Sequence, residues 1–457
     1  MSEKKQLHLG VFLQGVGHTI AWRHPAHAQF TEFETYVRFA QTAERGKFDF
    51  IFFGEGLVVR EHQGRFFGPI VNGRPDTIAL LPALAAVTEK IGLAATLSST
   101  YNAPYELARQ LASIDHVSDG RAAWNVVTTF SNSAAKDSGG DQVAYNFSKE
   151  KHLDHATRYD RAREFVTLIK KLWDSWDDDA LAGGQLDQRK VYPVEHYGEW
   201  FSVRGPLDVP RSPQGHPVII QAGQSDDGRD LAARIADVIF SPHRNIDEAR
   251  AFYADLTHRL TQYGRSKADL RILPGLTVVV APTEAQAQAK AAYYRTLLGT
   301  PAIGCYLLSE QSGYDFSDID LDGPFPDVDT TRPEVNGALL ERWKTLATNE
   351  HLTVQQLIDR VTPRRTLVGS PTQVADHCQA WIETEASDGF ILTPTLFPGD
   401  LDDFVELVVP ELQRRGVFRT EYTGDTLRHH LGLKRPAVPT RATRGARHRT
   451  HSPQDRS

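Results

Sequence analysis

The chain has 457 residues, 40% of them hydrophobic and 24% charged, which suits one elaborated barrel domain with a sizeable core. Its formal net charge of −7 gives no reason to expect nucleic acid or an anionic membrane as a partner. The two cysteines, Cys305 and Cys378, lack CxxC spacing, which argues against a disulfide scaffold or a thiolate metal site and fits a reducing, cytoplasmic location.

Short apolar or β-branched runs recur along the chain and predict strands. They cover residues 7–13, 49–54, 91–98, 121–128, 217–223, 236–241, 276–282 and 388–394. Helical patterns separate several of these runs, at residues 32–45, 78–89, 103–118 and 156–176. Alternating strands and helices imply a parallel sheet, and eight such units favour an α/β fold of the (β/α)8 TIM barrel type over an open sheet.

The organisation of the chain follows from the segments that break this alternation. We expect residues 1–433 to form a single barrel domain, with an extended excursion over 180–215 that holds a hairpin around HYGEWFSVRG. An insertion at about 298–370 contains the loop-like QSGYDFSDIDLDGPFPDVDTTRPE, and long insertions of this kind are usually lids or binding loops. Residues 434–457 are basic and lack an apolar period, so we expect a disordered, solvated tail.

Several motifs that would assign a reaction are missing from the sequence. It contains no GxxxxGK[ST] phosphate loop, no GxGxxG opening a helix after a strand, no HExxH and no GxSxG. A P-loop nucleotide site, a Rossmann dinucleotide site, a zincin centre and an α/β-hydrolase nucleophile are therefore unsupported. His24 and His27 lack a matching carboxylate pattern, so no metal site is expected.

Polar residues gather where the predicted strands end, which is where a barrel places its active site. These ends carry amides, hydroxyls and one carboxylate, and they offer no obvious pair of nucleophile and base. Such groups suit a flat heterocycle with many polar edges, so the sequence favours a site that binds a cofactor. The groups are Gln14, His18, Glu55, Thr96, Ser98, Ser99, Asn125, Thr128, Gln221, Gln224 and Ser225.

The stretch VIIQAGQSDDGRDLAARIAD, residues 218–237, raises two interpretations. A strand stops at a tight turn containing Gly223, and a helix begins at Ser225 or Asp226. Ser225 could simply cap the helix. Alternatively, the free N–H groups of the first turn, the helix dipole and the Ser225 hydroxyl together favour a phosphate. Asp226 and Asp227 add like charge nearby, which weakens the phosphate interpretation.

Four stretches carry a specific resemblance. They are VFLQGVGHTIAWR, YNAPYELARQLASIDHVSDGRAAWNVVTTF, RYDRAREFVTLIKKLWDSW and WFSVRGPLDVPRSPQGHPVIIQAGQSDDGRDLAARIADVIF. The chain resembles the flavin-dependent monooxygenases of the bacterial luciferase-like superfamily over roughly residues 6–425. The group it looks like contains component A of nitrilotriacetate and EDTA monooxygenases and dibenzothiophene sulfone monooxygenase.

The resemblance implies a function and its partners. It implies the oxygenase component of a two-component monooxygenase, which receives FMN as FMNH2 from a separate NAD(P)H:FMN reductase. Dioxygen would add to the flavin C4a, and the resulting peroxide would oxygenate a small organic substrate. The protein would hold the flavin and exclude water. The resemblance also implies a homodimer or a higher homo-oligomer.

The same resemblance implies the residues that bind the flavin. Glu55 stands where the family usually has Asp, and its extra methylene puts a contact to the flavin ring in doubt. Thr96 matches the third-strand position, and His155 and Tyr159 match a His-x-x-x-Tyr pair ahead of the long helix. Without the resemblance, His155 would be an ordinary helix-start residue and Tyr159 a packing residue. Ser225 matches the phosphate position.

Two further residues are candidates for the reaction itself. Asn125 ends the fourth strand and could contact the flavin ring or the substrate, or bond local backbone. His18, within GHTIAWR, could hydrogen-bond the peroxide or the substrate, although a lone histidine is often structural. An apolar pocket lined by Phe12, Phe52 and Phe53 is also expected. We also expect Tyr314 and Phe316 of the insertion to cover the substrate.

Two alternatives stay open at this point. Other branches of the superfamily transfer hydride with the deazaflavin F420, so an F420-dependent oxidoreductase is the first. The second is a non-catalytic flavin-binding subunit, for which Glu55 in place of Asp leaves room.

Overall fold

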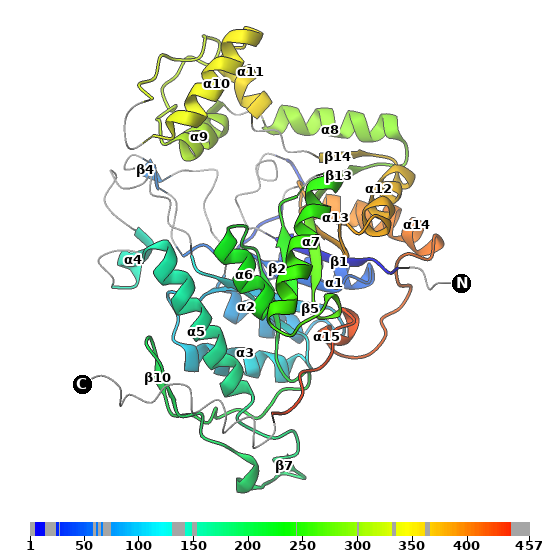
Figure 1. Cartoon of the computed structure of the whole chain (residues 1–457). Helices are drawn as coiled ribbons and strands as arrows, with labels where there is room; N and C mark the ends of the chain where they lie inside the picture. The colour runs from blue at the N-terminus through cyan, green and yellow to red at the C-terminus, as the bar shows by residue number, and fades with distance from the viewer. Residues whose placement is uncertain are drawn as a thin grey trace, which may run out of the picture.

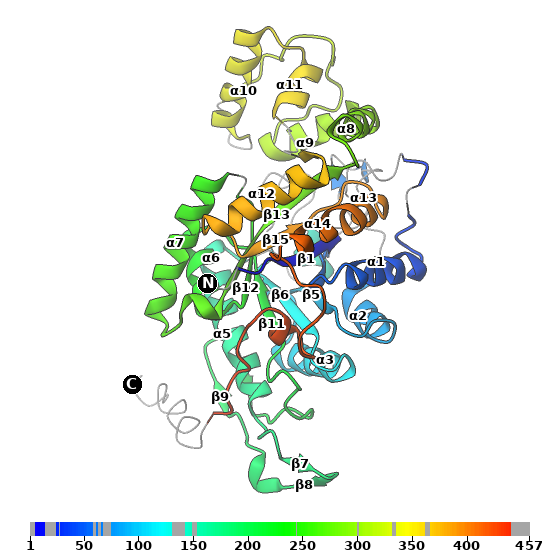
Figure 2. The ribbon, with the colours of Figure 1, turned by 90° about the vertical axis from the view of Figure 1, so that its right-hand side faces the viewer.

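The eight expected strands are present and close into a parallel barrel (Figures 1 and 2). The computed structural model describes residues 5–13, 24–26, 28–57, 61–62, 65–66, 75–129, 142–148, 153–243, 245–298, 301–330, 335–361 and 366–439. Around the barrel the strands follow chain order, and the β12–β13 pairing closes the circle, which confirms the (β/α)8 prediction. They are β1 (His8–Leu13), β2 (Phe50–Phe53), β5 (Gly92–Ser98), β6 (Ala122–Val127), β11 (Val218–Gln221), β12 (Val238–Ser241), β13 (Arg271–Val280) and β15 (Gly389–Leu392).

Helices surround the barrel, and those predicted from the sequence lie within a few residues of their expected bounds. They are α1 (Phe33–Arg45), α2 (Thr77–Ala85), α3 (Pro104–Val117), α5 (His155–Trp173), α6 (Asp226–Ile235), α7 (Ile246–Gln262), α8 (Glu284–Leu298), α12 (Pro371–Glu383), α13 (Gly399–Asp403) and α14 (Val409–Arg414). A short helix α4 (Gln142–Asn146) precedes α5, and a π-helical turn, Phe404–Val408, joins α13 to α14. Within the described residues, no helix combines the length and apolarity needed to cross a membrane.

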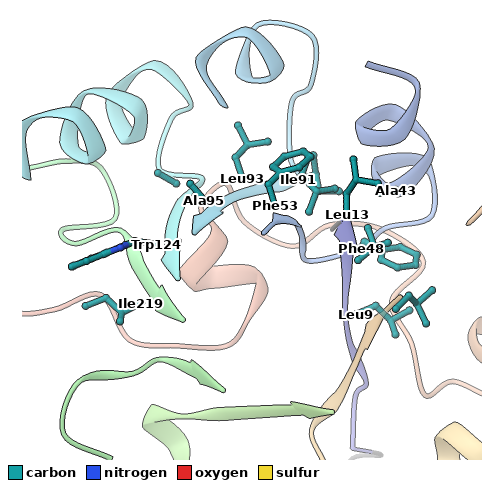
Figure 3. Packing of buried hydrophobic residues seen from close by; sticks show 14 of the residues in the cluster. Leu9, Leu13, Ala43, Phe48, Phe53, Ile91, Leu93, Ala95, Trp124 and Ile219 are labelled. Atoms are coloured by element: carbon teal, nitrogen blue, oxygen red, sulfur yellow. The ribbon is translucent and has the colours of Figure 1, made fainter. Parts of the chain in front are cut away.

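Side chains alternate between the barrel lumen and the layer under the helices, because successive residues of a strand point to opposite faces. On β5, Leu93, Ala95 and Leu97 belong to the outer cluster that packs against helices, whereas Ala94 belongs to the cluster inside the barrel. Figure 3 shows part of the outer layer, where Leu93, Ala95 and neighbouring apolar residues lie between strands and helices. This alternation places Thr96, two residues after Ala94, in the lumen.

The seventh strand begins earlier than its expected position at residue 276. It starts at Arg271, and Pro274 pairs with Ser241 in register. Pro and Gly usually interrupt strands, so Pro274 and Gly275 concealed this half of β13. A Cβ at Gly275 would lie 3.0 Å from the Phe240 ring, so glycine leaves room for that ring inside the barrel.

The C-terminal segment fills the end of the barrel where the strands begin. Leu427, Leu431 and Leu433 join the cluster inside the barrel, and the first two are fully buried. A Cβ at Gly92, the first residue of β5, would lie 2.6 Å from Leu427. The short helix α15 (Leu427–His430) therefore closes the lumen from below, and the opposite end, where the strands finish, is left for a site.

The insertion combines three helices with the expected loop, since residues 313–330 form turns and irregular structure after α9 ends. It contains α9 (Pro301–Ser312), α10 (Gly337–Glu350) and α11 (Val354–Val361), and it stands beyond the barrel (Figure 1). It has its own apolar cluster, in which Leu308 and Phe316 are fully buried. Phe316 therefore packs inside the insertion, and the expectation that it covers a substrate is wrong. The strand β14 (Thr366–Gly369) returns the chain to β13.

The excursion and the start of the C-terminal tail lie at the other end of the molecule (Figure 2). The predicted hairpin is present as β9 (His196–Tyr197) and β10 (Ser202–Val203), preceded by β7 (Leu181–Ala182) and β8 (Gln185–Leu186). A further two-residue pair, β3 (Glu61–His62) and β4 (Arg65–Phe66), follows β2. Arg435 forms ion pairs with Asp178, and residues 440–457 lie outside the described residues.

A buried carboxylate ties the first two strands to the C-terminal segment. Asp49 accepts hydrogen bonds from the Leu9 N–H at 2.8 Å and from Arg419, and its Oδ1 lies 3.2 Å from His8 Nδ1. Arg419 also donates to the carbonyl of His430. Burial alone would raise the pKa of Asp49, but the Arg419 guanidinium and the His8 ring lower that pKa to about 2.

We expect Asp49→Asn to lower the free energy of unfolding by roughly 3 kcal/mol at pH 7, because Arg419 would remain buried without its partner. The folded-state pKa lies below the unfolded value of about 3.9, so the carboxylate's contribution is present above pH ~4 and is lost as the pH falls toward ~2. The difference between wild type and variant should therefore shrink by about 2 kcal/mol between pH 5 and pH 2 in urea unfolding. Glu34→Gln on the exposed face of α1 is the control, and parallel pH profiles for the wild type and Asp49→Asn would contradict this role.

Candidate active site

Four neighbouring strands bring the expected cofactor-binding residues to one arc of the barrel mouth. Strand β2 pairs with β5, β5 with β6, and β6 with β11. Glu55 follows β2 and is half-buried, Thr96 and Asn125 lie near the ends of β5 and β6, and Ser225 follows β11. Residues scattered over 170 positions of sequence thus share one half of the mouth, which we call the polar arc (Glu55, Thr96, Asn125 and Ser225).

The centre of the polar arc is a hydrogen bond inside the lumen. Thr96 and Asn125 are opposite one another in the register of β5 and β6. The Asn125 amide Nδ2 donates to Thr96 Oγ1 at 3.1 Å, and both side chains are buried. Asn125 Oδ1 has no partner among the described residues although it is fully buried. An unpaired buried acceptor is costly, so this oxygen is suited to receive an N–H donor from a ligand.

The two serines that follow Thr96 serve the backbone instead. Ser98 Oγ accepts from the N–H groups of Thr100 and Tyr101 at 3.1 and 3.3 Å, and Ser99 Oγ donates to the Val127 carbonyl. These bonds shape the turn after β5. Both serine hydroxyls are therefore engaged by the backbone, whereas Asn125 Oδ1 is available to a ligand.

Ser225 caps helix α6, as the simpler of the two interpretations predicted. Its Oγ accepts from the Gly228 N–H at 3.1 Å, and its backbone is extended, with φ −63° and ψ 165°. A capping hydroxyl still has its own hydrogen to donate. The N–H groups of Asp226 and Asp227 open the same turn and have no intrahelical acceptor. Capping and anion binding are therefore compatible at this helix start.

Gly223 is required by close packing rather than by a left-handed backbone. A Cβ at Gly223 would lie 2.9 Å from the Cα of Gly228 and 2.5 Å from the Gln221 amide nitrogen. The Gln221 side chain also accepts from the Gly223 N–H at 2.7 Å. The strand-to-helix turn is thus pressed onto the first turn of α6, which holds the Ser225 hydroxyl and the helix N–H groups in one place.

The two aspartates at the start of α6 are both engaged by other side chains. Asp226 pairs with Arg259 of α7 at 2.6 Å. Asp227 Oδ2 lies 3.3 Å from His155 Nδ1, at the start of α5. Asp226 thus has a guanidinium beside it and Asp227 an imidazole, which offsets part of the charge that would oppose an anion at this helix start.

His155 and Tyr159 lie beside this helix start. Helices α5 and α6 are in contact, side by side in Figure 1, and Asp154 caps α5 by accepting from the Thr157 N–H at 3.0 Å. The rings of His155 and Tyr159 have centroids 4.8 Å apart, so the four-residue spacing puts them on one face. Tyr159 is buried and His155 is exposed. The structure links His155 to the Ser225 turn through Asp227.

Several groups at the barrel mouth could not be predicted from the sequence, and one predicted residue, His18, cannot be compared with the structure. The His155–Asp227 pair, the Phe240 ring and a hydroxyl pair between Thr277 and Thr393 at 2.6 Å carry no local motif that would have revealed them. Of the expected aromatic pocket, Phe12 and Phe52 face the lumen, but Phe53 faces the helices and packs with Tyr36 and Phe39. His18 lies outside the described residues.

Comparisons with known proteins agree with this architecture. The family model described as luciferase-like monooxygenase matches residues 15–388. The chain is 44% identical over 460 residues to nitrilotriacetate monooxygenase component A of Aminobacter aminovorans, covering 95% of this chain and 98% of the relative. It is 40% identical over 458 residues to dibenzothiophene-sulfone monooxygenase of Rhodococcus erythropolis strain XP, covering 96% and 99%. The crystal structure of DmoA from Hyphomicrobium sulfonivorans superposes with a TM-score of 0.80 at 32% identity, covering 93% of this chain and 92% of that one.

The comparison that bears on the F420 alternative is more distant. A coenzyme F420 dependent tetrahydromethanopterin reductase from Methanopyrus kandleri shares 14% identity at a TM-score of 0.55, covering 89% of this chain and 99% of that one. This degree of likeness shows a shared fold alone.

A matched pair of capping serines tests the local account of α6. Ser370 caps α12 as Ser225 caps α6, accepting from the Gln373 N–H. We expect Ser225→Ala and Ser370→Ala each to lower the free energy of unfolding by about 1 kcal/mol, because each removes one capping hydrogen bond. Chemical denaturation of both variants measures this. A Ser225→Ala variant as stable as the wild type would mean that the hydroxyl does not cap the helix.

Proposed function

The chain belongs to the luciferase-like monooxygenase family, and from that premise we propose that it is the oxygenase component of a two-component, FMNH2-dependent monooxygenase. The observation that carries the proposal is the polar arc, where a buried unpaired acceptor on Asn125 and an open helix start at Ser225 lie on neighbouring strands. The acceptor on Asn125 needs an N–H donor, and the helix start at Ser225 suits an anion. A molecule with an imide-bearing ring at one end and a phosphate at the other meets both needs.

The residues of the polar arc fit FMN. Asn125 Oδ1 would accept from the ring imide, and Thr96 Oγ1, which accepts from Asn125, would fix the orientation of that amide. Ser225 and the first-turn N–H groups of α6 would hold the phosphate. His155 and Tyr159 would flank the chain between ring and phosphate. A contact of Glu55 with the ring, and a role of His18 at the reacting end, stay predictions.

The groups at the site indicate which part of the chemistry the flavin would supply and which part the protein would supply. Bound reduced flavin would supply the electrons that activate dioxygen, because the polar arc itself offers no nucleophile–base pair. The chain's own part is to bind and orient the ring through Asn125 and Thr96. The buried apolar side chains inside the barrel, Phe52 among them at 2% exposure, would keep water from reaching the ring through the lumen.

The partners follow from the same proposal. A relative named as component A belongs to an enzyme of more than one component, and we extend that arrangement to this chain. A flavin reductase would deliver FMNH2, dioxygen would be the second substrate, and a small organic molecule the third. A homodimer or a higher homo-oligomer is part of the proposal.

An anaerobic titration with reduced FMN tests the proposal directly. We expect one site per chain, about tenfold tighter for wild type than for Ser225→Ala, because the variant loses one hydrogen bond to a charged group. Ser370→Ala, which removes the same kind of cap from a different helix, α12, should bind FMNH2 as the wild type does. Admitting oxygen with a reductase and NADH should then give substrate-dependent oxygenation. Equal FMNH2 affinities of Ser225→Ala and Ser370→Ala would show that the phosphate does not bind at the start of α6.

The ring end of the site has its own test. Asn125→Leu keeps much of the volume and removes both polar atoms, so it should weaken FMN binding by about tenfold without abolishing folding. Val126→Ala, which truncates the neighbouring side chain on the face of β6 that packs under the helices, should leave FMN affinity nearly unchanged. Fluorescence quenching of FMN measures both, and an Asn125→Leu variant with wild-type affinity would place the ring elsewhere.

A further inference from the structure

Four charged side chains join the start of α6 to α7, the helix beside it in Figure 2. Arg259 of α7 donates from Nη2 to Asp226 Oδ1 at 2.6 Å. Arg259 Nε also donates to both oxygens of Asp255, one turn earlier in α7, at 3.0 and 3.1 Å. Arg229 of α6 donates to the same Asp255 at 3.0 Å. We call Asp226, Arg229, Asp255 and Arg259 the α6–α7 charge cluster, and their formal charges cancel.

Asp226 occupies a position with two opposed effects. It is the first residue of α6 and directly follows Ser225, which caps that helix. A carboxylate here stabilises the helix, because it lies at the positive end of the helix dipole. The same carboxylate would repel an anionic ligand at the helix start. Left free, it would also turn back to accept from the first-turn N–H groups, which are the donors that such a ligand needs.

Arg259 is placed to hold this carboxylate away from the helix start. Its side chain is 19% exposed and is anchored by Asp255, whereas the Asp226 side chain is 78% exposed. The guanidinium is therefore the fixed member of the pair, and it draws the Asp226 carboxylate toward α7. Arg229 Nη2 lies 3.9 Å from the same Asp226 oxygen, so a second guanidinium attracts it as well.

The ion pair between Arg259 and Asp226 matters more for a ligand than for the fold. A pair with so exposed a carboxylate adds little to stability, since water screens it. Without Arg259, however, the cluster would carry one net negative charge, at the helix start. Asp227 has the half-exposed imidazole of His155 beside it, at 3.3 Å, and that ring is no substitute for a permanent cation.

We propose that Arg259 is a positioning residue for the anionic end of the cofactor and acts on it through Asp226. It keeps the Asp226 carboxylate on the side of α7 and cancels its charge, so the Ser225 hydroxyl and the first-turn N–H groups stay available to a phosphate. The proposal rests on the proposed function, which places the FMN phosphate at this helix start. It gives a role in flavin affinity to a residue of α7 that need not touch the flavin.

FMN and riboflavin are the matched ligands that test this role, because they differ only in the phosphate. Quenching of flavin fluorescence measures the binding of both to the full chain. Arg259→Gln should weaken FMN by about fivefold, as one net charge does in a partly exposed site, and leave riboflavin unchanged. Equal weakening of the two flavins would overturn the proposal, because it would show a general disturbance of the barrel mouth.

Removing the aspartate separates the effect of charge from that of structure. Asp226→Asn eliminates the carboxylate that Arg259 neutralises, so the double variant Asp226→Asn/Arg259→Gln should bind FMN within about twofold of the wild type. Asp226→Asn alone should bind FMN at least as tightly as the wild type. A double variant that binds FMN as weakly as Arg259→Gln would contradict the role of Arg259 through Asp226.

Arg415 provides a matched control on another pair of helices. It pairs with Asp376 of α12 at 2.7 Å and with Glu411 one turn before it at 2.8 Å, and its side chain is 14% exposed. Arg415→Gln should therefore shift the urea unfolding midpoint about as much as Arg259→Gln does, without changing the affinity for FMN. Weakened FMN binding by Arg415→Gln would show that the effect is not specific to the start of α6.

Failure of this inference is distinguishable from failure of the proposed function. If Ser225→Ala weakens FMN binding and Arg259→Gln does not, the phosphate placement stands and the role of Arg259 falls. If the Arg259 and Asp226 variants change FMN affinity as expected, but a reductase, NADH and oxygen give no oxygenated product, the role of Arg259 stands and the proposed function falls.

Discussion

Closure of the eight-stranded sheet, through the β1–β15 and β12–β13 pairings, is the constraint on which the rest of the structure depends. In a closed parallel sheet every second side chain must enter the lumen, and all strands finish at the same end. Thr96 and Asn125 can therefore meet only because β5 and β6 pair in a register that sets them opposite one another. The leucines of the C-terminal segment block one end, so the lumen opens toward the strand ends alone.

Charge at the mouth is arranged around the start of α6. A helix start beside two aspartates would be a poor place for an anion if both carboxylates faced it. The pairings of Asp226 with Arg259 and of Asp227 with His155 draw these carboxylates to neighbouring helices. The contact between Gly223 and Gly228 holds the turn close to the helix, so the hydroxyl and the N–H groups converge.

Much of the fold could be predicted from the sequence, because buried parallel strands are continuous apolar runs and their alternation with helices is periodic. The exceptions have local causes. Pro274 and Gly275 hid the first half of β13, and polar loops around Tyr314 masked the helical insertion, whose core forms only when α9, α10 and α11 pack together. The capping role of Ser225 was readable, since it depends on neighbours in sequence.

The parts of the site that escaped prediction depend on contacts between distant segments. Nothing near Asp227 indicates that His155 lies 3.3 Å away, and nothing near Thr277 indicates Thr393. Period-two alternation would have separated Phe52 from Phe53 had the lumen face been known, but an all-apolar strand does not reveal which face is inside.

A crystal structure of the full chain soaked with FMN tests the central claim most directly. The account predicts phosphate density against Ser225 and the first-turn N–H groups of α6, with the ring imide within hydrogen-bond distance of Asn125 Oδ1. Phosphate density elsewhere, or a ring that leaves Asn125 Oδ1 without a contact, would contradict it.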